Sequence, residues 1–147
     1  MVAAVVLTGC GSSSSSGSDE EASFTGSGIP NGDLANTRFQ SSGPIDSSTV
    51  SELELVWKLP LKATSAFGSY ASVPIISKGV MYSQDLASNV QAIDVQSGEV
   101  LWTATFEQPD HGPNGVVVAE GLVFGITPTE AFALNQETGQ QEWSVKL

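Results

Sequence analysis

The sequence predicts an all-β fold, and three features support this: short strand-like runs, regularly spaced turns and an internal repeat. From Ala71 onward, runs of four to eight residues rich in β-branched and aromatic types alternate with turn residues. No stretch shows the sustained 3.6-residue periodicity of a helix. The pattern therefore predicts four antiparallel strands in up-and-down order, followed by a second, similar set.

The second set repeats the first at a fixed spacing. Gly115–Gly121 matches the stretch ending at Gly79 with an offset of 42 residues, and Ala133–Trp143 matches Ala92–Trp102 with an offset of 41. A repeated four-stranded unit of about 40 residues is typical of a β-propeller blade. We therefore predict a β-propeller fragment with two four-stranded antiparallel blades, at about residues 71–106 and 115–147.

The N-terminal residues predict export. Residues 1–10 are mostly apolar and end in Leu7-Thr8-Gly9-Cys10, which resembles the lipobox of bacterial lipoproteins, where the cysteine is acylated. No Lys or Arg precedes the apolar run, unlike in a usual export signal. Residues 11–28 are mostly Ser and Gly and predict a flexible spacer. We expect Cys10 to hold the protein in a lipid bilayer, on the periplasmic or extracellular face of the cell envelope. The alternative is an ordinary thiol.

Composition excludes several classes of function. Five Lys and Arg against sixteen Asp and Glu give a net charge of −11, which excludes binding of a nucleic-acid backbone. A single cysteine and a single histidine exclude an intrachain disulfide and a metal site built from Cys or His, so we expect no metal site in the chain. The chain has no apolar run near the roughly 20 residues that span a bilayer.

A motif near the end of each repeat resembles that of a known family. Its polar side chain can bond turn amides, and its glycine suits a backbone with positive φ. The motif resembles the tryptophan-docking motif of pyrroloquinoline-quinone (PQQ) dehydrogenase propellers and their non-catalytic relatives. This resemblance implies that each indole lies between its own motif's Ala and the glycine peptide of the next blade; the alternative is two ordinary hairpins, each with a core Trp. The two copies read Ala92-x-Asp94-x-x-Ser97-Gly98-x-x-x-Trp102 and Ala133-x-Asn135-x-x-Thr138-Gly139-x-x-x-Trp143.

The resemblance extends upstream and covers residues 31–147, and we predict the propeller region at residues 29–147. Asn31–Arg38 resembles the lead-in before the family's first blade, and Leu53–Lys58 resembles a further outer strand carrying Trp57. In a closed ring, an N-terminal strand of this kind completes the last blade. Propellers have about four to eight blades, so we expect a fragment whose partners include the remaining blades.

Four loops are predicted to gather at one mouth of the propeller. In the dehydrogenases that the motif resembles, the quinone lies at this mouth, a calcium ion polarises it and a carboxylate accepts the alcohol proton. The chain departs from that pattern: Ala71 stands where the enzymes carry a Glu, and residues 109–114 lack their vicinal cysteine pair and Arg. No catalytic or cofactor-binding residue can therefore be assigned, and PQQ and calcium are expected only with the full-length protein. The four loops are Ser65–Tyr70, Gln84–Ser88, Pro109–Asn114 and Thr127–Thr129.

Two interpretations of the mouth residues and of the function stay open. Asp110 and His111 could form an acid–base pair or serve turn geometry, and Tyr70 and Phe67 could stack a planar ligand or pack between blades. We predict first an exported, lipid-anchored propeller that binds or scaffolds partners. The alternative is part of a PQQ- and calcium-dependent alcohol or sugar dehydrogenase. In either case the chain alone is expected to be inactive.

Overall fold

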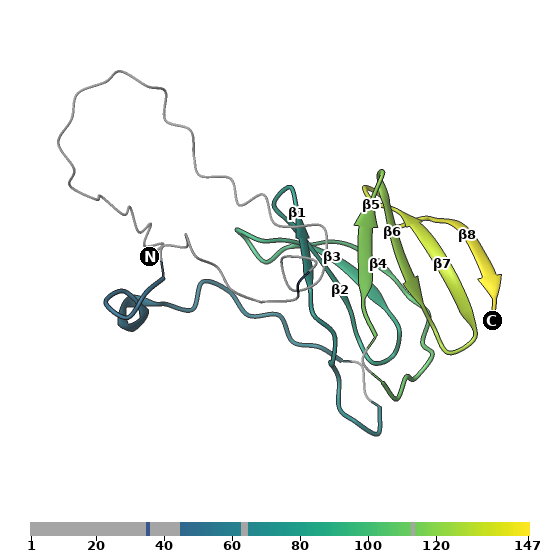
Figure 1. Cartoon of the computed structure of the whole chain (residues 1–147), viewed down its shortest axis with the longest axis horizontal. Coiled ribbons are helices and arrows are strands. Elements are labelled where there is room, and N and C mark those ends of the chain that lie inside the picture. The colour runs from purple at the N-terminus through teal and green to yellow at the C-terminus, as the bar shows by residue number, and fades with distance from the viewer. Residues whose placement is uncertain (1–34, 36–44, 63–64, 113) are drawn as a thin grey trace, which may run out of the picture.

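The computed structural model describes residue 35 and residues 45–62, 65–112 and 114–147. This part of the chain forms two four-stranded antiparallel sheets that lie side by side (Figure 1). Its helical structure is one short 3-10 helix, Val50–Glu52. The predicted all-β fold with two blades is confirmed. Cys10 and most of the expected lead-in at 31–38 lie outside the described residues.

Each sheet has its strands in sequence order, and we call the two sheets blade 1 and blade 2. In both sheets the first and second strands are joined by a two-residue turn in which a charged residue and a glycine have positive φ: Lys78 and Gly79 at 50° and 77°, Glu120 and Gly121 at 51° and 78°. Such turns match the twist of a hairpin. The strands of blade 1 are β1 (Ile75–Ser77), β2 (Val80–Gln84), β3 (Val90–Asp94) and β4 (Val100–Ala104). Those of blade 2 are β5 (Val116–Ala119), β6 (Leu122–Ile126), β7 (Glu130–Asn135) and β8 (Gln141–Lys146).

The two blades share one apolar core at their interface. The aromatic rings of Phe106 and Phe132 stack across it with centroids 4.6 Å apart. Burial of these side chains is what holds one blade against the other, because each sheet alone would leave an apolar face in water. The buried members of the cluster are Ile75, Tyr82, Val90 and Ala92 from blade 1 and Val116, Val123, Phe132 and Leu134 from blade 2.

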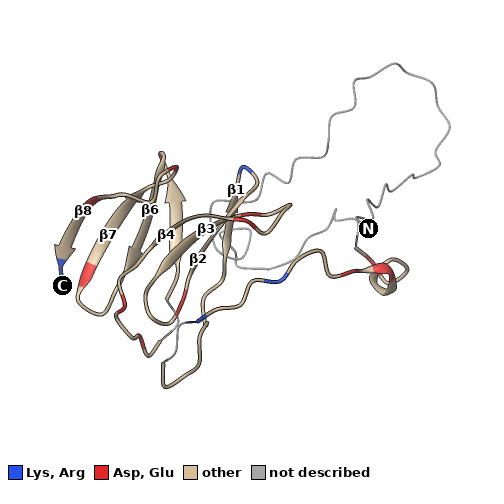
Figure 2. Ribbon diagram, turned by 180° about the vertical axis from the view of Figure 1, so that it is seen from behind, with Lys and Arg blue, Asp and Glu red and all other residues tan. Residues whose placement is uncertain are grey.

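The charged side chains lie mainly in turns, loops and strand ends (Figure 2). Among the described residues, no helix has the length and apolar character needed to cross a membrane.

The segment that carries Trp57 is not a strand, contrary to the prediction. Residues 53–62 pair with no neighbouring strand in the described part of the chain. The backbone of Leu53 is extended, with φ −66° and ψ 130°, but a β-strand exists only where a second strand supplies hydrogen bonds. The segment is instead held by its indole, as described below.

Candidate functional site

Trp102 is docked between the two blades. It lies opposite Ala92 in the β3–β4 ladder, and its ring covers the peptide of Gly139 so closely that a Cβ on that glycine would come within 2.5 Å of it. The indole N–H donates a hydrogen bond to the carbonyl of Gln136 at 3.1 Å. The predicted position, between the Ala of its own motif and the glycine of the next blade, is confirmed for Trp102.

Trp57 docks on blade 1 in the same way. A Cβ on Gly98 would lie 2.6 Å from its ring, and its N–H donates to the carbonyl of Val95 at 2.8 Å. Val95 and Gly98 occupy the same places in blade 1 as Gln136 and Gly139 in blade 2. The docking contact is therefore made twice along the chain, once by a tryptophan whose own segment lacks the motif.

The polar residue of each motif closes its turn as predicted. The Asp94 carboxylate accepts hydrogen bonds from the backbone N–H and the hydroxyl of Ser97, both at 2.8 Å. Asn135 accepts from the backbone N–H of Thr138 at 3.1 Å. The bonds from Ser97 favour the charged carboxylate and hold the pKa of Asp94 below its ordinary value of 3.8.

The four predicted mouth loops meet through hydrogen bonds. The backbone N–H of Leu86 donates to the carbonyl of Ser69 at 3.0 Å, and that of Asp110 donates to the carbonyl of Leu86 at 2.9 Å. The hydroxyl of Thr129, in the fourth loop, donates to the side-chain oxygen of Gln108, the residue directly before the third loop, at 2.8 Å. The gathering of these loops at one end of the blades is confirmed, and we call this end the mouth.

Buried polar residues, which sequence reasoning missed, support the mouth loops. Gln84, Asp85 and Ser88 are at most 8% exposed. Asp85 accepts the backbone N–H groups of Ala87 and Asn89, while the Ser88 hydroxyl donates to a loop carbonyl beyond β4. The available signal was the polar pair Gln84-Asp85 at the end of a mostly apolar strand, because unpaired polar groups are costly to bury.

The proposed acid–base pair is not formed. The Asp110 carboxylate accepts from the backbone N–H of His111 at 2.6 Å and of Gly112 at 3.3 Å, which is turn geometry. His111 is exposed, and its ring meets Phe67 edge-on at 6.1 Å. Phe67 is itself 66% exposed, so it does not pack between blades, whereas the Tyr70 hydroxyl accepts from Ser83 at 3.1 Å.

The mouth of these two blades does not make a quinone or cation site by itself. Its described residues contain no Lys or Arg to bind the carboxylates of such a quinone, and Ala71 is exposed. The described part of the chain also contains no group of three or more His, Cys, Asp or Glu able to hold a metal. The side-chain oxygen of Asn114 is a buried acceptor without a hydrogen-bond partner. This oxygen suits a hydrogen-bond donor or a cation, and not the acceptor atoms of a quinone.

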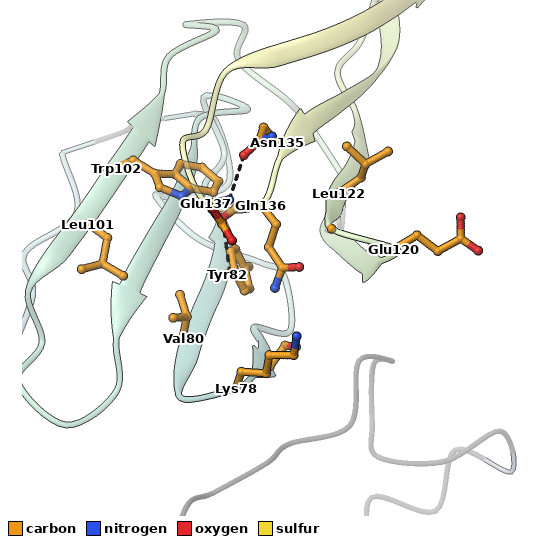
Figure 3. Close-up of a pocket in the computed structure, with 12 residues that line it drawn as sticks. Lys78, Val80, Tyr82, Leu101, Trp102, Glu120, Leu122, Asn135, Gln136 and Glu137 are labelled. Atoms are coloured by element: carbon orange, nitrogen blue, oxygen red, sulfur yellow. Dashed lines mark hydrogen bonds between the residues drawn. The ribbon is translucent and has the colours of Figure 1, made fainter.

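A cavity of about 740 Å³ lies on the opposite end of the blades, between their hairpin turns (Figure 3). Tyr82 and Trp102 both direct polar hydrogens at the Gln136 carbonyl there. Burial raises the pKa of Tyr82 above its ordinary value of 10.0. The cavity is lined by Ser77, Lys78, Val80, Tyr82, Leu101 and Trp102 of blade 1 and by Glu120, Gly121, Leu122, Asn135, Gln136 and Glu137 of blade 2.

Comparison with known proteins identifies the family. Residues 29–117 match the family described as PQQ glucose/ethanol/alcohol dehydrogenase, β-propeller domain. The chain belongs to this family. It is 36% identical over 121 residues to the 1-butanol dehydrogenase (cytochrome c) of Thauera butanivorans, covering 76% of this chain and 17% of that one. It is 32% identical over 118 residues to a quinoprotein alcohol dehydrogenase of Pseudomonas putida, covering 75% and 20%.

A solved structure shows the same arrangement of blades. The quinohemoprotein alcohol dehydrogenase of Comamonas testosteroni superposes with a TM-score of 0.69 at 26% identity, over 78% of this chain and 18% of that one. The chain thus spans about a fifth or less of the length of these relatives. The predicted PQQ-type propeller family is confirmed.

Proposed function

We propose that the chain is the N-terminal part of a PQQ-dependent alcohol dehydrogenase, in which its two blades form a sector of the propeller wall. The observation that carries the proposal is the 36% identity to an alcohol dehydrogenase over 76% of this chain. This favours the dehydrogenase, our second prediction from sequence, over the scaffold that we placed first. In this proposal the blades position the mouth loops, and the groups that bind the quinone and the cation come from the rest of the protein.

The test uses the protein expressed from its complete gene. Purified apoprotein is supplied with PQQ and either Ca²⁺ or a lanthanide ion, and a primary alcohol is offered in a dye-linked assay. The proposal expects turnover that requires both the quinone and the ion. The 147-residue chain, assayed in parallel, should show none, because catalysis of this kind needs groups positioned by several blades. Absence of quinone-dependent turnover by the complete protein would contradict the proposal.

A scaffold propeller is the second candidate, and the composition of the mouth favours it. Neither a basic residue nor a metal-ligand cluster is present among its described residues. If the rest of the complete protein lacks basic residues and carboxylates at the mouth as well, and if PQQ titration produces no change in tryptophan fluorescence, the scaffold becomes the better function.

We also propose that the protein is exported and anchored through Cys10 to the lipid of the cell envelope. The support is the sequence Leu7-Thr8-Gly9-Cys10 followed by a spacer at residues 11–28. Attachment of two or more acyl chains would give stable anchoring, where one chain gives only marginal binding. Fractionation of cells that express the complete gene tests this: the wild type should follow the membrane and Cys10→Ser should be released. Membrane association of Cys10→Ser would contradict lipid attachment there.

A further inference from the structure

The side chain of Gln84 crosses the interface between the blades at the mouth. It lies at the end of β2 and is fully buried, at 0% exposure. Its amide oxygen accepts from the backbone N–H of Gly115 at 3.0 Å, and its amide nitrogen donates to the carbonyl of Ile126 at 2.9 Å. The amide can have only this orientation, because Gly115 offers a donor and Ile126 an acceptor. One side chain of blade 1 thus holds the start of β5 and the end of β6.

The backbone around Gln84 holds the residues that precede each first strand. The Gln84 carbonyl accepts from the Ser72 hydroxyl at 2.7 Å, and the Asp85 carbonyl accepts from the Asn114 side-chain amide at 2.8 Å. Ser72 precedes β1 and Asn114 precedes β5, and these two strands lie beside each other. Residues 84 and 85 therefore set the spacing between the two first strands at the mouth.

The repeat shows that a blade does not need a glutamine at the position of Gln84 in order to form. By strand register, its counterpart in blade 2 is Ile126, which is 52% exposed. A β2-type strand therefore forms without a glutamine at this position. Burying a primary amide is unfavourable unless its hydrogen bonds are made. Within blade 1 the amide nitrogen of Gln84 has one longer bond, to the carbonyl of Ser88 at 3.4 Å, and the two shorter bonds come from blade 2.

We infer that Gln84 is a positioning residue for the mouth: it fixes the loop before β5 relative to the start of β1, so that a ligand of the mouth meets a preformed wall. The inference rests on the proposed function where it names PQQ as that ligand. Gln84 itself is buried behind the loops and acts through Gly115 and Asn114, and not by contact with the cofactor.

The experiment uses the protein from the complete gene, with Gln84→Met, Gln84→Glu and the control Gln96→Met. Met keeps the shape of Gln but neither hydrogen bond. Glu keeps both, because burial favours the neutral acid, which accepts from Gly115 and donates to Ile126. Gln96 is exposed in the β3–β4 turn. The measurements are hydrogen exchange of the peptide that contains Gly115 and the affinity for added PQQ.

In Gln84→Met we expect local exchange around Gly115 to rise about tenfold or more, beyond any change in β2 and β3. PQQ affinity should fall by about 10- to 100-fold through misplacement of the wall. Gln84→Glu should largely restore both, and Gln96→Met should match the wild type. Unchanged exchange at Gly115 in Gln84→Met would overturn the inference, and so would an equal loss in Gln84→Glu. A wild-type protein that binds no PQQ would instead contradict the proposed function, while the exchange measurement still decides the role of Gln84.

Discussion

The two blades carry the same motif in different surroundings. Trp102 of blade 1 is docked on Gly139 and hydrogen-bonded to Gln136, whereas Trp143 of blade 2 is 43% exposed. Both nevertheless pair with the Ala of their own motif, and both ladders shift register at the next residue. The hairpin therefore forms from its own residues alone, while the tryptophan provides the contact with a following blade.

The face of blade 2 that points away from blade 1 is exposed, whereas the equivalent face of blade 1 is covered by blade 2. Phe106 packs against the shared core, and its counterpart by the repeat is Leu147, which is 77% exposed. β8 is exposed along its whole length. In blade 1 the corresponding surface packs against blade 2, whereas on blade 2 its apolar side chains are exposed. These side chains are Val117, Ile126, Trp143, Val145 and Leu147.

Replacing Trp102 or Trp143 by Ala should give the largest difference in stability between the two blades. In this chain, Trp102→Ala should lower the free energy of unfolding by about 3–5 kcal/mol, because it leaves a cavity between the blades. Trp143→Ala should cost under about 1 kcal/mol, as is usual for a surface change. Urea unfolding followed by circular dichroism at low protein concentration measures both. In a protein extended by a third blade the two costs should converge. Equal costs in the 147-residue chain would contradict the docking of Trp102.

Two turn glycines with nearly the same φ allow backbone strain to be separated from contact with the indole. Gly121 and Gly139 have φ of 78° and 70°, but a Cβ on Gly121 has no atom within 4 Å, while one on Gly139 meets Trp102. Gly121→Ala should cost about 1–2 kcal/mol from backbone strain alone. Gly139→Ala should cost a further 1–3 kcal/mol, roughly, from overpacking. Thermal unfolding of the two variants side by side measures the difference, and no difference would mean that the indole is free to move away.

The hydrogen bond of Trp57 should contribute less than its ring. Trp57→Phe keeps an aromatic ring over Gly98 but loses the donor to the Val95 carbonyl. The expected loss is about 0.5–1.5 kcal/mol, measured by urea unfolding. Trp57→Ala should cost more, because the face of the Gly98 peptide then becomes exposed. If both variants unfold like the wild type, residues 53–62 do not dock in solution.

The turns closed by Asp94 and Asn135 should respond differently to low pH, because only the first contains a titratable group. The pKa of Asp94 is lowered in the folded state by its bonds from Ser97, so its contribution to stability is present above its ordinary value of 3.8 and is lost as the pH falls through the lower, folded value. Asn135 does not titrate. Asp94→Asn should therefore give a melting temperature that falls less than that of the wild type between about pH 5 and pH 3. Parallel curves for the two proteins would show that the carboxylate is not engaged.

The sequence alone was sufficient for the blades and their turns, because strand alternation, positive-φ glycines and the Asp94 and Asn135 turns are local features that recur at one spacing. The docking of Trp102 was predicted from the resemblance of the repeated motif to that of a known family. Prediction from the sequence failed for residues 53–62, where a strand depends on a partner that local sequence does not reveal. It also missed the role of Gln84, whose hydrogen-bond partners in blade 2 lie 31 and 42 residues further along the chain.

Size-exclusion chromatography with light scattering on the 147-residue chain tests most directly whether blade 2 presents an unfilled blade contact. Exposed apolar faces and free strand edges promote association with other chains. We predict oligomers or aggregates, and a shift toward monomer when Trp143 and Val145, 43% and 61% exposed, are both replaced by Lys. A sharp monomer peak with a cooperative melt for the unmodified chain would show that the two blades are self-sufficient, and would contradict this interpretation of blade 2.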